Sequence, residues 1–157
     1  MLVEIGSTLD PSVFNASQIK KTAEKLYQAL YTKKRLDSCY PEPVDAELSI
    51  FIIGDKKMRS LNLEYRKKDK TTDILSFPLI ERTSRTVCSV QSSHLGDIVI
   101  NIRQAQRQAK MRGAALKSEL QWLIAHGILH LVGYDHEKSS SDEAEMRLLE
   151  QELLSGL

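Results

Sequence analysis

Residues 117–131 are the segment that most limits what this chain can fold into. Apolar side chains surround nearly the whole of the helix that the segment predicts, with Leu120, Ile124 and Ile128 on one side and other apolar residues covering most of the rest. A helix that is apolar nearly all round is buried, so we expect this one at the centre of the molecule. Gly133 follows closely and can adopt the positive φ that ends a helix.

The same segment and the turn after it hold three of the chain's four histidines, His126, His130 and His136. His126 and His130 are four residues apart, so their Cβ atoms lie about 5–6 Å apart on one helix face, and both imidazoles can reach one metal ion. The turn at Gly133 lets His136 approach from a third direction. Three protein ligands leave the open coordination position that is typical of a catalytic zinc site. We therefore predict a divalent-metal site for the hydrolysis of a phosphodiester, a peptide or a small molecule.

Gly127 bears on which of these substrates is cleaved. Metalloproteases with a His-Glu-x-x-His motif use the glutamate directly after the first histidine as general base, and Gly127 stands at that position. This argues against peptide hydrolysis by the usual route. Glu119 could replace the missing base, but a glutamate there is more typical of a solvated residue or of one that supports a ligand. Asp135 is expected to form a turn or to orient a metal-bound imidazole, and His94 is expected to be a loop histidine rather than a fourth ligand.

Hydrophobic periodicity predicts four strands and five helices along the chain. Such a pattern indicates an α+β fold, a small mixed sheet of about four strands with helices packed on it. A length of 157 residues fits one domain, so we expect residues 1–157 to form a single domain. The polar stretch 81–94 is expected to loop out around a brief hairpin. The strands are expected at 3–5, 47–53, 74–77 and 96–100, and the helices at 16–33, 56–66, 102–113, 117–131 and 141–154. Asp55 is expected to cap the second of these helices and Asn101 the third.

Basic residues cluster in two segments, although the net charge is only +1. If both segments share one face, they form an electrostatic footprint for a polyanion; two solvated helix surfaces are an equally good interpretation. Segment 56–70 contributes Lys56, Lys57, Arg59, Arg66, Lys67, Lys68 and Lys70, and segment 101–117 contributes Arg103, Arg107, Lys110, Arg112 and Lys117.

The sequence predicts no secretion signal, no membrane-spanning run and no paired cysteines. The N-terminus shows no secretion signal, and no apolar run approaches the length of about 20 residues that spans a bilayer. Cys39 and Cys88 are far apart in the chain and suggest neither a disulfide framework nor a thiolate metal site. A reducing, cytoplasmic location is therefore the default expectation.

The histidine segment resembles the signature of the YbeY-type rRNA maturation factors, His-Gly-x-Leu-His-Leu-x-Gly-Tyr-Asp-His, and matches each fixed position from His126 to His136. Segments 61–66, 68–69, 72–78 and 95–98 resemble the family's other two blocks in the same order. One departure is Thr71, where family members often have proline; it implies a slightly different loop. The insert at 81–94 and the N-terminal third match nothing diagnostic.

This resemblance implies a metal-dependent, single-strand-selective endoribonuclease that matures the 3′ end of small-subunit rRNA and acts in ribosome quality control. It implies that His126, His130 and His136 bind one divalent ion, with Zn²⁺ as first choice, on a helix similar to that of the zincins. It also assigns a catalytic role to Arg66.

The expected partners are single-stranded RNA or rRNA and the ribosome or its small subunit, with no membrane and no DNA. Phosphate contacts position a strand without reading its sequence, and we expect them from Arg66 and from neighbouring cations. An aromatic content of 6% predicts no large base-stacking platform. Two alternatives stay open: a ribosome-associated RNA-binding factor with a structural metal, and a zincin-like hydrolase of peptides or small molecules. The nucleophile, water on the metal or the RNA 2′-hydroxyl, also stays open. The further cations expected to guide RNA are Lys67, Lys68, Arg103 and Arg107.

Overall fold

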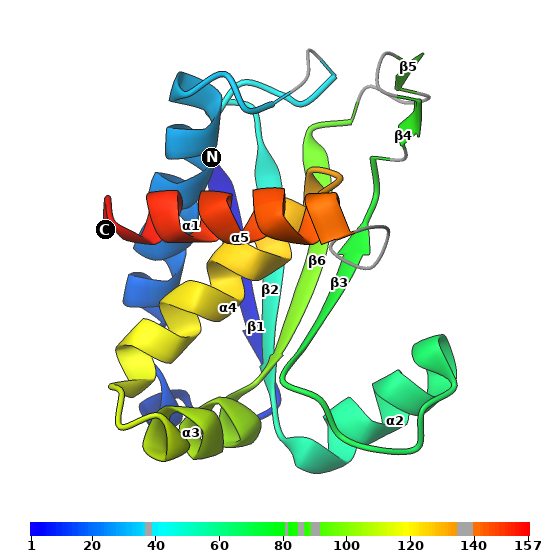
Figure 1. Ribbon diagram of the computed structural model, residues 1–157. Coiled ribbons are helices and arrows are strands. Elements are labelled where there is room, and N and C mark those ends of the chain that lie inside the picture. The colour runs from blue at the N-terminus through cyan, green and yellow to red at the C-terminus, as the bar shows by residue number, and fades with distance from the viewer. Residues whose placement is uncertain (37–38, 81, 85–86, 89–91, 135–139) are drawn as a thin grey trace.

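A four-stranded mixed sheet forms the middle of the molecule (Figure 1). The computed structural model describes residues 1–36, 39–80, 82–84, 87–88, 92–134 and 140–157. The sheet order is β1 (Leu2–Ser7), β2 (Glu47–Ile53), β6 (His94–Asn101) and β3 (Ile74–Pro78). The first three strands run parallel, and β3 pairs antiparallel with β6 as an edge strand. These elements confirm the expected α+β fold with a small mixed sheet.

Alternation along the strands separates two apolar layers, because successive side chains point to opposite faces of a sheet. Ile50 of β2 lies opposite Ile98 of β6, and both are fully buried in the main core. Their neighbours Val99 and Ile53 belong to a second, smaller cluster. The sheet therefore has a large apolar layer on one face and a smaller apolar layer on the other.

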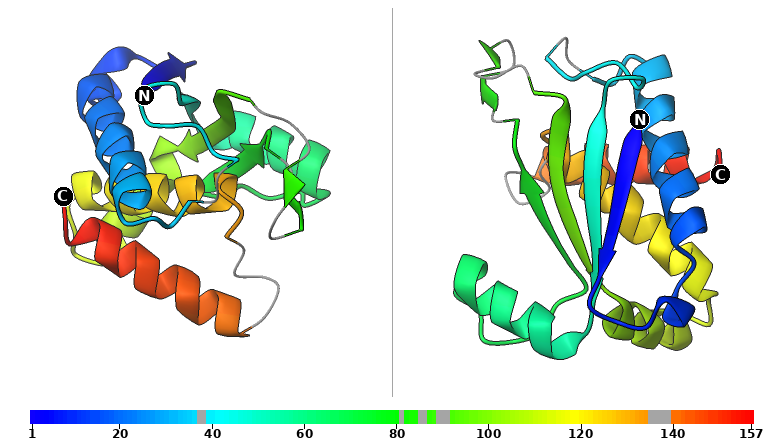
Figure 2. Two further views of the ribbon diagram at one scale, coloured as in Figure 1. Left: turned by 90° about the horizontal axis from the view of Figure 1, so that it is seen from above. Right: turned by 180° about the vertical axis from the view of Figure 1, so that it is seen from behind.

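Helices α1 (Ala16–Thr32), α4 (Leu116–Leu131) and α5 (Ser140–Leu154) cover the main-core face (Figures 1 and 2). Helix α4 is the central one, packing against the sheet and against both α1 and α5. Leu123, Ile128 and Leu129 are fully buried on different sides of it. The expectation of a central helix, apolar nearly all round, is confirmed.

Helix α2 (Asp55–Arg66) packs on the opposite face, where Met58 belongs to one buried cluster with Ile53, Leu75 and Val99. Its end at Arg66 agrees with the predicted helix at 56–66. The cap differs: Gly54 occupies the N-cap position with no side-chain bond, and Asp55 lies in the first turn. The helix ends where Lys67 adopts the left-handed conformation, with φ of 58°.

Helix α3 (Ile102–Met111) begins directly after β6. As predicted, Asn101 caps it, because its Oδ1 accepts hydrogen bonds from the backbone N–H groups of Arg103 and Gln104. A one-turn 3₁₀ helix at Pro11–Val13 precedes α1. The expected hairpin within 81–94 exists as a short ribbon of β4 (Arg82–Ser84) and β5 (Val87–Cys88).

Two further sequence expectations concern cysteines and membranes. Cys39 is disulfide-bonded, which the spacing of the two cysteines did not suggest. Within the described ranges, no helix combines the length and apolarity that a bilayer crossing requires.

Candidate metal centre

Helix α4 brings His126 and His130 together, as their spacing predicted. Their Nε2 atoms are 3.1 Å apart, and the two rings lie edge to face with centroids 4.6 Å apart. Two nitrogens bound to one tetrahedral ion at about 2.05 Å each would lie about 3.3 Å apart. The pair therefore fits two neighbouring positions of one zinc coordination sphere.

His136, the expected third ligand, and Asp135 lie outside the described residues. Among the residues that are described, no group of three His, Cys, Asp or Glu side chains could hold a metal ion. The complete ligand set of His126, His130 and His136 therefore stays a prediction.

Glu150 of α5 contacts the other ring nitrogen of His126. Its Oε1 lies 2.7 Å from His126 Nδ1, and its exposed fraction is 8%. At this distance Oε1 can accept a hydrogen bond from Nδ1–H, which would leave the lone pair on Nε2, the form that binds a metal. The indole N–H of Trp122 donates to Oε2 at 3.3 Å. Sequence reasoning did not single out Glu150.

The carboxylate of Glu119 forms an ion pair with Arg112. Glu119 is 97% buried, and both carboxylate oxygens accept from Arg112 Nη1 at 2.9 and 2.8 Å. The guanidinium of Arg112 in turn lies over the Trp122 ring, 5.6 Å from its centroid. This favours the supporting role over that of a replacement general base.

His94 is the first residue of β6 rather than a loop residue. Its Nε2 lies 3.1 Å from Ser49 Oγ on β2, so its contact is with the sheet.

Gly127 faces the sheet at very close range. A Cβ atom there would lie 2.8 Å from Ile98 Cδ1 and 3.0 Å from Ile74 Cδ1. A glutamate would therefore project into the packed layer between α4 and the sheet. Packing against the sheet therefore disfavours the metalloprotease base at this position.

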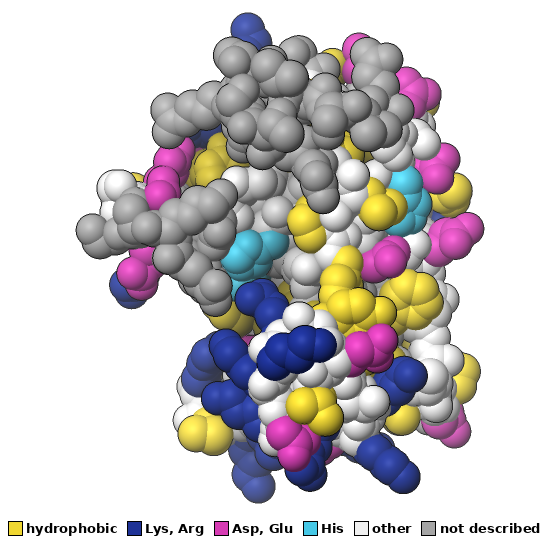
Figure 3. Space-filling view, turned by 90° about the vertical axis from the view of Figure 1, so that its right-hand side faces the viewer, with side chains coloured by type: hydrophobic (Ala, Val, Ile, Leu, Met, Phe, Trp, Pro, Cys, Tyr) yellow, Lys and Arg dark blue, Asp and Glu magenta, His cyan; other side chains and the backbone are white. Residues whose placement is uncertain are grey.

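The α2 basic surface lies beside this centre. We define it as Lys56, Lys57, Arg59, Arg66, Lys67, Lys68 and Lys70, all of which are exposed. α2 contacts β3 through Leu75 and α4 approaches β3 through Ile74, so the two helices flank the same edge strand from opposite faces. Figure 3 faces this edge, and a histidine side chain lies directly above Lys and Arg side chains that gather over the lower part of the view.

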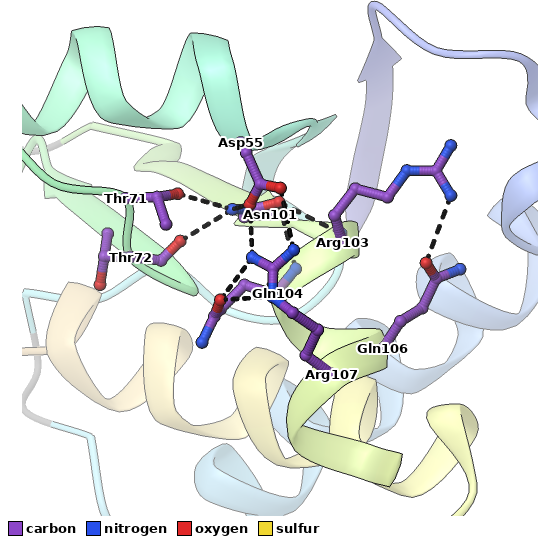
Figure 4. A network of polar contacts seen from close by, with 8 residues as sticks. All are labelled: Asp55, Thr71, Thr72, Asn101, Arg103, Gln104, Gln106 and Arg107. Carbon is purple, nitrogen blue, oxygen red and sulfur yellow. Dashed lines mark hydrogen bonds and ion pairs between the residues drawn. The ribbon is translucent and has the colours of Figure 1, made fainter. Parts of the chain in front are cut away.

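A polar network holds the start of α2 against β6 and α3 (Figure 4). The buried Asn101 side chain donates to Asp55 Oδ1 at 2.8 Å, Thr71 Oγ1 at 2.9 Å and the Thr72 carbonyl at 3.1 Å. The guanidinium of Arg107 donates hydrogen bonds to both Asp55 carboxylate oxygens, at 2.9 and 2.6 Å. These hydrogen bonds lower the pKa of Asp55 to about 2.

Two arginines expected to guide RNA belong to α3. Arg107 has its charge offset by Asp55. Arg103 Nη1 reaches Gln106 Oε1 at 3.4 Å.

The sheet, the central helix and the histidine pair together define an α+β protein with a candidate metal centre at a sheet edge. A family model described as Endoribonuclease YbeY matches residues 7–157. The chain belongs to the endoribonuclease YbeY family, as the signature indicated, and is thereby an enzyme that cleaves phosphodiester bonds within RNA in rRNA processing.

Relatives from several bacteria support this assignment. An Endoribonuclease YbeY of Thermodesulfovibrio yellowstonii is 42% identical over 141 residues, covering 90% of this chain and 85% of that protein. One from Aquifex aeolicus is 47% identical over 113 residues, covering 72% of this chain and 71% of that protein. A solution structure of a Thermotoga maritima protein shares the fold, with a TM-score of 0.61 and 22% identity over 98% of this chain and 87% of that one.

Proposed function

We propose that this endoribonuclease is metal-dependent and cuts single-stranded RNA, with His126, His130 and His136 binding one divalent ion, zinc as first choice. The observation that carries the proposal is the convergence of the two Nε2 atoms, 3.1 Å apart, while Nδ1 of His126 is held by a carboxylate. An imidazole held in this way beside a second imidazole is suited to a divalent ion.

The chain's own groups have separate tasks in this mechanism. Neutral imidazoles hold a cation without cancelling its charge. A divalent ion bound there would polarise a phosphoryl oxygen and lower the pKa of a bound water. Arg66, at the end of α2, offers a planar fork of donors to phosphate oxygens. The attacking group, water or the RNA 2′-hydroxyl, stays open.

The proposed substrate follows from the α2 basic surface. Lysines and arginines of the α2 basic surface contact phosphates without reading bases, so single-strandedness and ribosomal partners would select the cleavage site. We propose the 3′ end of small-subunit rRNA as the target, with a further role in ribosome quality control. The ribosome or its small subunit would be the partner, the cytoplasm the location, and residues 1–157 one catalytic domain.

The decisive test replaces His126 or His130 with alanine. We expect bound zinc, measured by mass spectrometry of the metal, and cleavage of purified single-stranded RNA to be lost together. His94→Ala is the matched control, since His94 contacts Ser49 on the sheet, and it should keep both. Normal cleavage by a folded, metal-free His126→Ala protein would refute the mechanism.

Arg66→Ala should keep its metal but cleave at least about tenfold more slowly, because a charged phosphate contact is lost. Lys25→Ala is the control, since Lys25 is an exposed cation on α1, outside the α2 basic surface. Equal rates in both variants would leave Arg66 with a structural role only.

The alternative of an RNA-binding factor with a structural metal rests on the same basic surface. It would be favoured if metal-ligand variants bound ribosomes and restored rRNA processing in cells. Peptide hydrolysis is disfavoured by the packing around Gly127, and a casein assay with zinc-loaded protein tests it directly.

A further inference from the structure

We propose that Glu150 is a positioning residue that fixes His126 in the Nδ1-protonated tautomer and so directs the Nε2 lone pair to the point shared with His130. The inference rests on the proposed metal centre. It adds the C-terminal helix α5 to that centre, 24 residues along the chain from His126.

The placement of Glu150 within α5 is the first argument. Met146, Leu149 and Leu153 form the buried side of this helix, and Glu150 is buried among them, whereas Glu143 and Glu145 are exposed. A buried carboxylate costs free energy unless donors satisfy it. Glu150 has donors for both oxygens, from the His126 ring at 2.7 Å and the Trp122 indole at 3.3 Å.

The second argument is that the His126 ring is held on several sides at once. Trp122 stacks on it, with centroids 5.1 Å apart and planes 24° apart, and His130 lies at its far edge. Turning the ring over would break the bond to Glu150 and move Nε2 away from His130. The other neutral tautomer would aim a ring lone pair at the carboxylate, which is repulsive.

The tautomer follows from these contacts. A metal ligand needs an unprotonated nitrogen facing the ion, and the bond to Glu150 keeps the proton on the opposite nitrogen before any ion arrives. Carboxylates that orient metal-bound imidazoles in this way commonly affect metal affinity by about 10–100-fold. Glu150 is therefore expected to contribute to metal affinity without touching the ion.

The test uses Glu150→Leu, which suits the apolar side of α5, and Glu150→Gln, which keeps the size and a weaker acceptor. Nitrogen-15 spectra of the metal-free protein report the His126 tautomer, and calorimetry reports zinc affinity. We expect Glu150→Leu to lose the single Nδ1-protonated form and to bind zinc about 10–100-fold more weakly. Glu150→Gln should show a smaller change in both, and Glu145→Gln, on the exposed side of α5, no change in either.

The outcomes separate this inference from the proposed function. If the wild type binds zinc through His126 and both Glu150 variants keep its affinity and tautomer, the inference is overturned and the metal centre stands. If the wild type binds no zinc, the proposed function fails, while the metal-free spectra still judge Glu150. If Glu150→Leu does not fold, Glu150→Gln decides: an unchanged tautomer and an unchanged zinc affinity overturn the inference. A purely structural Glu150 would lower thermal stability and leave the tautomer unchanged.

Discussion

Replacing Gly127 with alanine tests how tightly the histidine helix is pressed onto the sheet. The new methyl group would lie 2.8 Å from Ile98 Cδ1, 3.0 Å from Ile74 Cδ1 and 3.2 Å from Ile98 Cγ1. Ile98 is fully buried, so its side chain has little space into which to retreat.

Two opposing effects set the size of the change. Overpacking a core by a methyl group costs about 1–3 kcal/mol, whereas exchanging glycine for alanine within a helix gains about 1 kcal/mol. We therefore expect Gly127→Ala to lower the free energy of unfolding by about 1 kcal/mol. A helix with free space at this position would instead be stabilised.

Urea unfolding followed by circular dichroism measures this value, and a double-mutant cycle tests its cause. Ile98→Val removes the Cδ1 atom nearest to the new methyl group. In that background the cost of Gly127→Ala should fall by about 1 kcal/mol, toward zero or a gain. Additive effects, within about 0.5 kcal/mol, would refute the steric explanation.

Two further predictions concern the sheet and the network of Figure 4. Gly96→Ala should destabilise the protein by at least about 2 kcal/mol in urea unfolding, because Gly96 has φ of 137° and a Cβ there would overlap the Phe77 carbonyl oxygen. A variant as stable as the wild type would contradict this. The pKa of Asp55 is lowered from 3.8 to about 2, so its contribution is present above about pH 4 and is lost as the pH falls toward 2. The full pKa shift corresponds to about 2 kcal/mol, which is discounted because the side chain is 43% exposed. We expect Asp55→Asn to lower the free energy of unfolding by about 1 kcal/mol at pH 7 and to reduce the loss of stability between pH 4 and 2. An unchanged pH profile of stability would exclude this role.

Most of the helices and strands could be predicted from local sequence patterns. The run 47–53 of β-branched and aromatic residues predicted β2, and the asparagine at 101 predicted the cap of α3, because both signals lie within a few residues. The strand order could not be read this way. β6 inserts between β2 and β3 through pairings such as Leu75 with Val99, and such register depends on the packed sheet.

The histidine spacing brought His126 and His130 together for the same local reason. Glu150 had no comparable signal, since its contact with His126 joins two helices that only tertiary packing places side by side. Arg107 illustrates the reverse problem: the sequence shows a cation, and only the fold shows that Asp55, 52 residues away, offsets it. Charge counts therefore overestimate the cations open to a polyanion.

The position of β6 in the sheet has a consequence for synthesis. β2 and β3 are translated first, but in the described residues β3 pairs with no strand other than β6, which begins at residue 94. In a nascent chain shorter than this, the edges of β2 and β3 that pair with β6 are unpaired and accessible to other chains. Ribosome-bound fragments ending before residue 94 should therefore be far more sensitive to protease and aggregation than fragments that include residue 101.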